Sequence, residues 1–262
     1  MGKKYKLITD DTRTTSKGVT IYRIEALRDF LNIKKGDRGG YIENELNLSH
    51  NGNAWVKGDA WVFGSACVAG DAWVFGDACV YGGACVSGNA EVSGDAWVFG
   101  NAGVKGNARV SGGACVSGSA CVAGDAWVFG NTEVYGNAGV YGGAKVHGGA
   151  KVHGNAWVTG NACVYENAEV SGNACVYGGA CVSGNAEVSG DAYVLGSARV
   201  SGDAWVLGSA EVSGDARVLG SAGVKGNARV SGNACVYGGA CVSGNAKVSG
   251  NTQVYGDAEV SR

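Results

Sequence analysis

A six-residue alternation of apolar and polar positions runs through most of this chain. From Gly52 onward the unit is G-[N/D/S/G]-A-x-V-x, repeated 35 times without insertion as far as residue 261. Val keeps its place in every unit, whereas Thr132 and Thr252 replace Ala and Glu166 replaces Gly. An internal repeat this regular predicts a solenoid in which each unit packs only against its neighbours.

The alternation within each unit predicts a short strand followed by a corner. In A-x-V-x, Ala and Val fall on one side of an extended segment and the variable residues on the other. Gly followed by Asn, Asp, Ser or Gly accepts the positive φ that a tight turn requires. Because the chain turns after every strand, it has no room for hairpins. We therefore expect it to coil about an axis, with Ala and Val inside.

This spacing resembles the hexapeptide-repeat family, whose motif places an aliphatic residue four positions before a small one. Val56 stands in this relation to Ala60, and Val62 to Ala66. The resemblance implies an all-β fold, a left-handed parallel β-helix. Such a fold is a single-stranded solenoid with three hexads in each coil, and the 35 hexads would make nearly twelve coils.

Three hexads in each coil would bring equivalent residues of every third hexad into contact. Opposite charges in adjacent positions of a ladder are favourable and like charges are not. Most of the outward charges that are three hexads apart are opposite in sign, although Arg199–Arg217 and Glu169–Glu187 are like-charged pairs. The opposite pairs are Glu91–Arg109, Glu133–Lys151, Lys151–Glu169 and Glu211–Arg229.

Residues 1–50 break the repeat and are expected to form an N-terminal capping subdomain ahead of a β-helix over residues 51–262. Strands are predicted at 5–9 and 19–24, a polar loop between them, and a short helix at 25–31, which together make a small α+β cap. A β-helix exposes a strand edge and an apolar core at each end, and the cap would cover them. The C-terminal end shows no comparable cap.

Residues 20–60 also resemble the opening of the YdcK-like bacterial and phage hexapeptide proteins. The shared features are TIYRIEALRDF, KKGDRGGYIENELNLS and the N-A-W-V start of the array. This resemblance implies a phage or phage-derived origin.

Composition and charge exclude several classes of protein. The 48 glycines come without proline and with a period of six, so the chain is not collagen. The net charge is −2, and residues 1–50 hold 10 basic and 7 acidic side chains, so no nucleic-acid partner is expected. No apolar run approaches the roughly 20 residues of a membrane span. The start lacks an apolar signal segment, which predicts a cytoplasmic protein, or a virion protein if the chain is phage-derived.

Outward aromatic residues are the most informative surface feature. Four D-A-W-V-F hexads in the first half of the array place large apolar side chains on the outside, where they are costly to leave in water. We expect them to contact another prism, a sugar ring or a lipid. An ice-binding face would instead need an outward threonine ladder, and the array has only three Thr. The candidate binding residues are Trp61, Phe63, Trp73, Phe75, Trp97, Phe99, Trp127 and Phe129.

Two histidines are candidate catalytic residues. His147 and His153 lie in neighbouring hexads, each with a lysine two residues before it. The hexapeptide-repeat resemblance implies an alternative function, an acyl-CoA-dependent acyltransferase in which His147 or His153 is the general base. A solvated pair of surface side chains remains the other interpretation. A zinc carbonic anhydrase would need three converging His, which this spacing does not offer, so no metal site is expected.

The sequence therefore predicts a non-catalytic β-helical scaffold without a cofactor. We expect it to act through self-association or partner binding. Prisms of the hexapeptide-repeat family commonly pack side by side, which implies a homo-oligomer formed through the faces or through the uncapped C-terminal end.

Overall fold

Each hexad forms one strand of two or three residues and one corner in the computed structural model, which describes residues 2–262. The strand is the x-V pair, as in β5 (Trp61–Val62), and the corner Gly has a φ near +70°, as at Gly58. Every Val from Val56 to Val242 is completely buried. Ala and Val therefore fill the interior, as the alternation predicts.

The hexads make about 12 turns of a β-solenoid whose three walls are parallel sheets. Strands three hexads apart pair in register, so that Glu91 lies beside Arg109 and Glu211 beside Arg229. This pairing confirms the predicted parallel β-helix with three hexads in each coil. The chain divides into two compact units, Met1–Gly130 and Asn131–Arg262.

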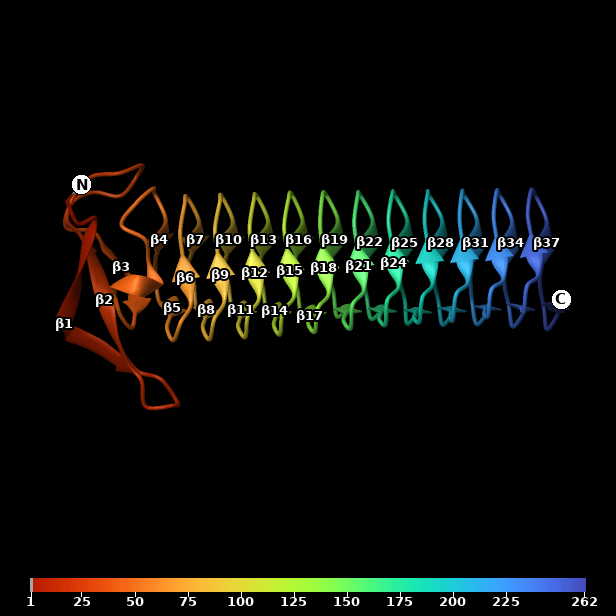
Figure 1. Cartoon of the computed structure of the whole chain (residues 1–262), viewed down its shortest axis with the longest axis horizontal. Helices are drawn as coiled ribbons and strands as arrows, with labels where there is room; N and C mark the ends of the chain where they lie inside the picture. The colour runs from red at the N-terminus through yellow and green to blue at the C-terminus, as the bar shows by residue number, and fades with distance from the viewer. Residues whose placement is uncertain (1) are drawn as a thin grey trace. The chain divides into compact units, whose positions relative to one another are not determined.

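The first unit begins with an antiparallel hairpin of β1 (Tyr5–Thr14) and β2 (Thr20–Ala26), followed by β3 (Arg38–Ile42) and the 3-10 turn η1 (Glu45–Asn47). β3 pairs with β2 on one side and, in parallel, with β5 on the other. Figure 1 shows the hairpin lying across the first coil.

The walls of the first unit are named here after their first hexad strands. The β4 face consists of β4 (Trp55–Val56), β7 (Trp73–Val74), β10 (Glu91–Val92), β13 (Arg109–Val110) and β16 (Trp127–Val128). The β5 face consists of β5, β8 (Cys79–Val80), β11 (Trp97–Val98) and β14 (Cys115–Val116). The β6 face consists of β6 (Cys67–Val68), β9 (Cys85–Val86), β12 (Gly103–Val104) and β15 (Cys121–Val122).

The walls of the second unit are named in the same way. The β17 face consists of β17 (Glu133–Val134), β20 (Lys151–Val152), β23 (Glu169–Val170), β26 (Glu187–Val188), β29 (Trp205–Val206), β32 (Gly223–Val224), β35 (Cys241–Ser243) and β38 (Glu259–Ser261). The β18 face consists of β18 (Gly139–Val140), β21 (Trp157–Val158), β24 (Cys175–Val176), β27 (Tyr193–Val194), β30 (Glu211–Val212), β33 (Arg229–Val230) and β36 (Lys247–Val248). The β19 face consists of β19 (Lys145–Val146), β22 (Cys163–Val164), β25 (Cys181–Val182), β28 (Arg199–Val200), β31 (Arg217–Val218), β34 (Cys235–Val236) and β37 (Gln253–Val254).

The helix expected at residues 25–31 does not form, so the N-terminal segment is not α+β. Residues up to Ala26 continue β2, because their backbone groups pair with β1 and β3 on both sides. The chain then closes a tight turn in which Phe30 and Ile33 exchange backbone hydrogen bonds. Helical backbone at Glu25 and Ala26 would give up those ladder bonds, which outweigh the weak helical preference of the sequence.

The N-terminal segment also satisfies the carbonyl groups of the first coil. Within the array, N–H groups of one coil donate to carbonyls of the next, as Trp73 does to Ala90 at 2.9 Å. The first coil has no coil before it, so its carbonyls would stay unpaired. Side chains supply some donors: Lys4 Nζ to Ala54 O at 2.7 Å and Asn47 Nδ2 to Gly64 O at 2.9 Å and Ala66 O at 2.8 Å. Backbone N–H groups supply others: Tyr41 to Ala60 O, Glu43 to Val62 O and Ser49 to Val68 O.

Candidate binding site

A column of three stacked rings stands on the β5 face of the first unit. Phe63, Tyr81 and Phe99 occupy the same position of every third hexad and follow the valines of β5, β8 and β11. The ring of Tyr81 is 5.1 Å from that of Phe63 and 4.9 Å from that of Phe99, and the planes are within 6° of parallel. The register of the solenoid therefore aligns them, since each coil adds one ring in the same place.

Two tryptophans flank this column on the same face. Trp61 and Trp97 occupy the outward position two residues before Phe63 and Phe99. Trp97 meets the ring of Tyr81 edge to face, at 6.2 Å between centroids. It is 50% exposed, which is unusual for a side chain of this size and marks it as available for contact.

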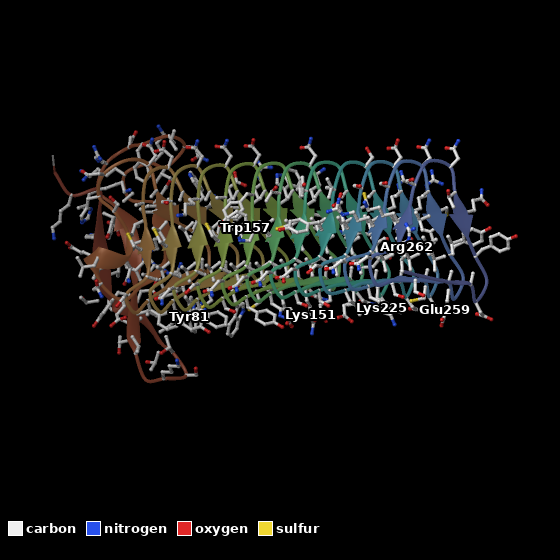
Figure 2. All side chains as sticks on the ribbon, turned by 45° about the vertical axis from the view of Figure 1, so that its right-hand side comes forward. Tyr81, Lys151, Trp157, Lys225, Glu259 and Arg262 are labelled. Atoms are coloured by element: carbon white, nitrogen blue, oxygen red, sulfur yellow. The ribbon has the colours of Figure 1, made fainter. Side chains whose placement is uncertain are left out.

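The β1–β2 hairpin loop covers one side of the ring column. Lys17 Nζ lies 5.8 Å from the centroid of Tyr81, and Figure 2 shows Tyr81 on the outside of the coils beside the projecting hairpin. Arg13 fixes the loop by donating to Asp59 at 2.9 Å. The guanidinium of Arg13 also lies over the ring of Tyr41, 4.6 Å from its centroid.

The loop, two rings of the column and the two tryptophans border a half-open cavity of about 310 Å³, which we call the loop cavity. Its floor is apolar, and Cys79 within it is uncharged at neutral pH because burial raises the pKa of its thiol to about 11. Its rim carries Lys17 and Asp77, neither of which forms an ion pair within residues 2–262. The lining residues are Arg13, Thr15, Ser16, Lys17, Asp59, Trp61, Phe63, Asp77, Cys79, Tyr81 and Trp97.

The other four predicted aromatic residues lie on the β4 face. Trp73 and Phe75 belong to the coil of β7, and Trp127 and Phe129 to that of β16. Trp127 lines a second cavity, of about 300 Å³, in which the guanidinium of Arg109 lies 5.1 Å from the Trp127 ring. The eight predicted residues therefore form two groups on two walls.

His147 and His153 are not brought together. His147 lies on the β19 face and stacks on Tyr165 at 5.2 Å, and burial, with a smaller contribution from Lys145, lowers its pKa. His153 lies on the β17 face, stacks on Tyr135 at 4.7 Å and places Nε2 2.8 Å from Glu169 Oε1. Each histidine thus has its own tyrosine and its own wall, and neither lines the loop cavity.

The described part of the chain has no group of three or more His, Cys, Asp or Glu placed to hold a metal ion. The third histidine, His50, stacks on Tyr5 at 4.3 Å and accepts a hydrogen bond from the backbone N–H of Lys4 at 3.1 Å. No helix within residues 2–262 is long and apolar enough to cross a membrane.

Comparison with known families gives one match. The model of the YdcK β-solenoid repeat matches residues 228–244, within β33, β34 and β35. It confirms the YdcK-like resemblance, and it lies in the array instead of residues 20–60, where the sequence suggested it. No curated protein matches the chain.

Two features of the site, Tyr81 and the covering loop, were not predicted from the sequence. Tyr81 was not recognised because its hexad, DACVYG, lacks the Trp and Phe of the aromatic hexads. Counting three hexads onward from Phe63 would have found it, because Phe63, Tyr81 and Phe99 form one series. The covering loop could not be found in this way, since nothing in residues 13–17 shows which wall they approach.

Proposed function

We propose that this protein is a non-catalytic binding scaffold and that the loop cavity is its binding site. The observation that carries the proposal is the closure of a ring-lined surface by a loop from outside the array. A cavity of about 310 Å³ with an apolar floor and a few polar rim groups has the size and composition typical of ligand sites.

The lining residues favour a ligand that combines a cyclic apolar group with a charge. Both faces of Tyr81 are covered by Phe63 and Phe99, so a bound group would contact the edge of Tyr81, the ring of Phe63 and the exposed indole of Trp97. Lys17 would attract an anionic substituent and Asp77 a cationic one. Because the ladder fixes the floor in advance, little conformational entropy would be lost when the ligand binds.

Ligand-observed NMR with the full chain tests this proposal. The probes are indole-3-acetate, tyramine and methyl glucoside, which present a ring with a negative charge, a positive charge or hydroxyl groups. We expect at least one probe to bind with a Kd on the order of 1 mM, as is usual for fragments of this size. Trp97→Ala should weaken that binding at least tenfold.

Trp157→Ala is the matched control. Trp157 is 52% exposed, against 50% for Trp97, and occupies the same position of its strand on the β18 face, outside the loop cavity. Binding should be unchanged in this variant. Absence of binding to the wild type, or equal weakening by both substitutions, would refute the proposal.

Self-association is the second part of the proposed function. Trp127 is 41% exposed and stands beside Phe129 on the β4 face, which supports contact between copies through that wall. Sedimentation velocity should show an oligomer that Trp127→Ser shifts toward monomer. An unchanged distribution in Trp127→Ser would exclude the β4 face as the interface.

A further inference from the structure

Two arginines stand side by side on the β19 face. Arg199 of β28 and Arg217 of β31 are paired in register, so their side chains leave adjacent strands at the same position. Their neighbours on either side in this column are uncharged, Cys181 of β25 and Cys235 of β34. Like charges in directly adjacent positions destabilise a sheet unless something offsets them.

Three other cations of the array have a carboxylate partner. Arg109 Nε lies 3.4 Å from Glu91, Arg229 Nε lies 3.7 Å from Glu211, and Lys151 Nζ lies 3.8 Å from Glu133. Within residues 2–262, neither Arg199 nor Arg217 has such a partner. The nearest corners carry Asp203 and Asp215, but neither approaches a guanidinium within ion-pair distance.

Two other like-charged pairs of strand residues stand in register in the array, and both have some compensation from within: in the pair Arg229–Lys247, Arg229 has Glu211 as an ion-pair partner. Glu169 and Glu187 are also adjacent in register. His153 lies 2.8 Å from Glu169 Oε1, and the Ser189 hydroxyl donates to Glu187 at 2.9 Å. The arginine pair has no carboxylate partner in the described chain, so both exposed guanidinium groups are free to bind an anion.

The two arginines line a groove of about 330 Å³ that suits an anion. Ser183 and Ser201 contribute hydroxyl groups, and Tyr165 and Leu219 contribute apolar surface. Ser183 is only 7% exposed, yet its hydroxyl has no hydrogen-bond partner within residues 2–262. The Ser183 oxygen is not among the fully buried unpaired atoms, so it is accessible from the groove and can donate to an anion there.

We propose that this groove binds a phosphate-type oxyanion between Arg199 and Arg217. Guanidinium groups present planar pairs of N–H donors that match two oxygens of a phosphate, and two of them would balance its double charge. The hydroxyls of Ser183 and Ser201 would donate to the remaining oxygens. An organic substituent on the phosphate would lie against Tyr165 or Leu219. This site is independent of the loop cavity.

Titration of the full chain, followed by amide chemical shifts at constant ionic strength, tests the site. The probes are inorganic phosphate and phenyl phosphate. We expect phosphate to bind with a Kd on the order of 1 mM and to shift the amides of β28 and β31. Phenyl phosphate should bind more tightly if the natural ligand is a phosphate ester, and no more tightly if it is free phosphate.

Arg199→Gln and Arg217→Gln should each weaken phosphate binding at least tenfold. Arg229→Gln is the matched control, because Arg229 occupies the same strand position on the β18 face but is paired with Glu211. Circular dichroism checks that all three variants remain folded. Equal weakening in Arg229→Gln, or no shift in the wild type at 20 mM phosphate, would overturn the proposal.

Discussion

In the array, a backbone carbonyl of one coil accepts a hydrogen bond from the coil before it, whereas the carbonyls of the first coil accept from residues 4–49. The array repeats the same backbone pairing in every coil, so the effect of a substitution there should depend mainly on its position within the hexad. The N-terminal segment uses a different donor for almost every carbonyl group. Some of these hydrogen bonds depend on single side chains, such as those of Lys4 and Asn47. Substitutions should therefore have regular effects in the array and individual effects in the segment.

The largest effect should come from a charge on the inner side of the array. Val212→Asp buries an unpaired carboxylate in a completely apolar interior and should cost at least several kcal/mol. Ser213→Asp places the same group one residue later, on the outside, and should cost less than about 0.5 kcal/mol. Urea denaturation followed by circular dichroism compares the two. Similar stability in both variants would contradict the inward position of the valines.

A smaller loss of stability should follow from removing one side chain of the N-terminal segment that donates hydrogen bonds to carbonyl groups of the first coil. Lys4→Met leaves the carbonyls of Ala54 and Gly52 without the ammonium group and should lower the free energy of unfolding by about 1–2 kcal/mol. Lys3→Met, at the neighbouring exposed position, should change it by less than about 0.5 kcal/mol. If the two variants are equally stable, Lys4 does not have this role.

Lys4 should also give the stability a pH dependence of known sign. Burial, with a contribution from Arg28, lowers the pKa of Lys4 from 10.5 to about 8. The native state thus binds this proton less tightly than the unfolded state, and the cost of the charge is complete below pH 8. As pH rises from 8 toward 10, the wild type should gain stability relative to Lys4→Met. A constant difference across that range would show that Lys4 keeps an ordinary pKa.

The one corner without glycine gives a still smaller test. Glu166 has a φ of 62°, a conformation that costs a side-chain-bearing residue roughly 1 kcal/mol. Its carboxylate accepts a hydrogen bond from the Gly184 N–H at 2.6 Å, which offsets part of that cost. Glu166→Ala removes this hydrogen bond and keeps the backbone strain. Glu166→Gly also removes the hydrogen bond but relieves the strain. We expect the alanine variant to be less stable than the glycine variant by about 1 kcal/mol in urea denaturation.

We expect the protein to show no acyltransferase activity, and an assay with acetyl-CoA tests this alternative function of His147 and His153. Incubation with acetyl-CoA and amine acceptors should release no free CoA thiol above background. The thiol is measured because the phosphates of acetyl-CoA could bind the Arg199–Arg217 groove without any reaction. Release that is lost in His147→Ala or His153→Ala would establish the acyltransferase instead.

The sequence predicts the array far better than the segment before it. A period of six with invariant Val sets strand, corner and register together, so pairs such as Glu91–Arg109 follow from counting residues. Residues 1–50 have no such period. Their strands are apparent from local pattern, but the helix expected at 25–31 fails because pairing with β1 and β3 decides the backbone there.

The candidate site divides in the same way. Most of the aromatic residues that line the loop cavity follow from the repeat, as Trp61, Phe63 and Trp97 illustrate. Trp55 occupies the same hexad position yet is completely buried, because Tyr5 and Phe30 pack against it. Contacts between the N-terminal segment and the array depend on distant residues, so the loop over Tyr81 becomes visible only in three dimensions.

The register of the coils also limits how a gene for such a protein can lengthen. The peptide SGNACVYGGACVSGNA occurs at 171–186 and at 231–246, ten hexads apart, and its first Cys lies on the β18 face in one copy and on the β19 face in the other. Duplication of one or two hexads therefore turns everything downstream to another wall, while duplication of three preserves it. Insertion of a single hexad between Phe63 and Tyr81 would separate Phe63 from the other two rings without disturbing one buried valine, so a lineage could lose the ring column and keep its fold.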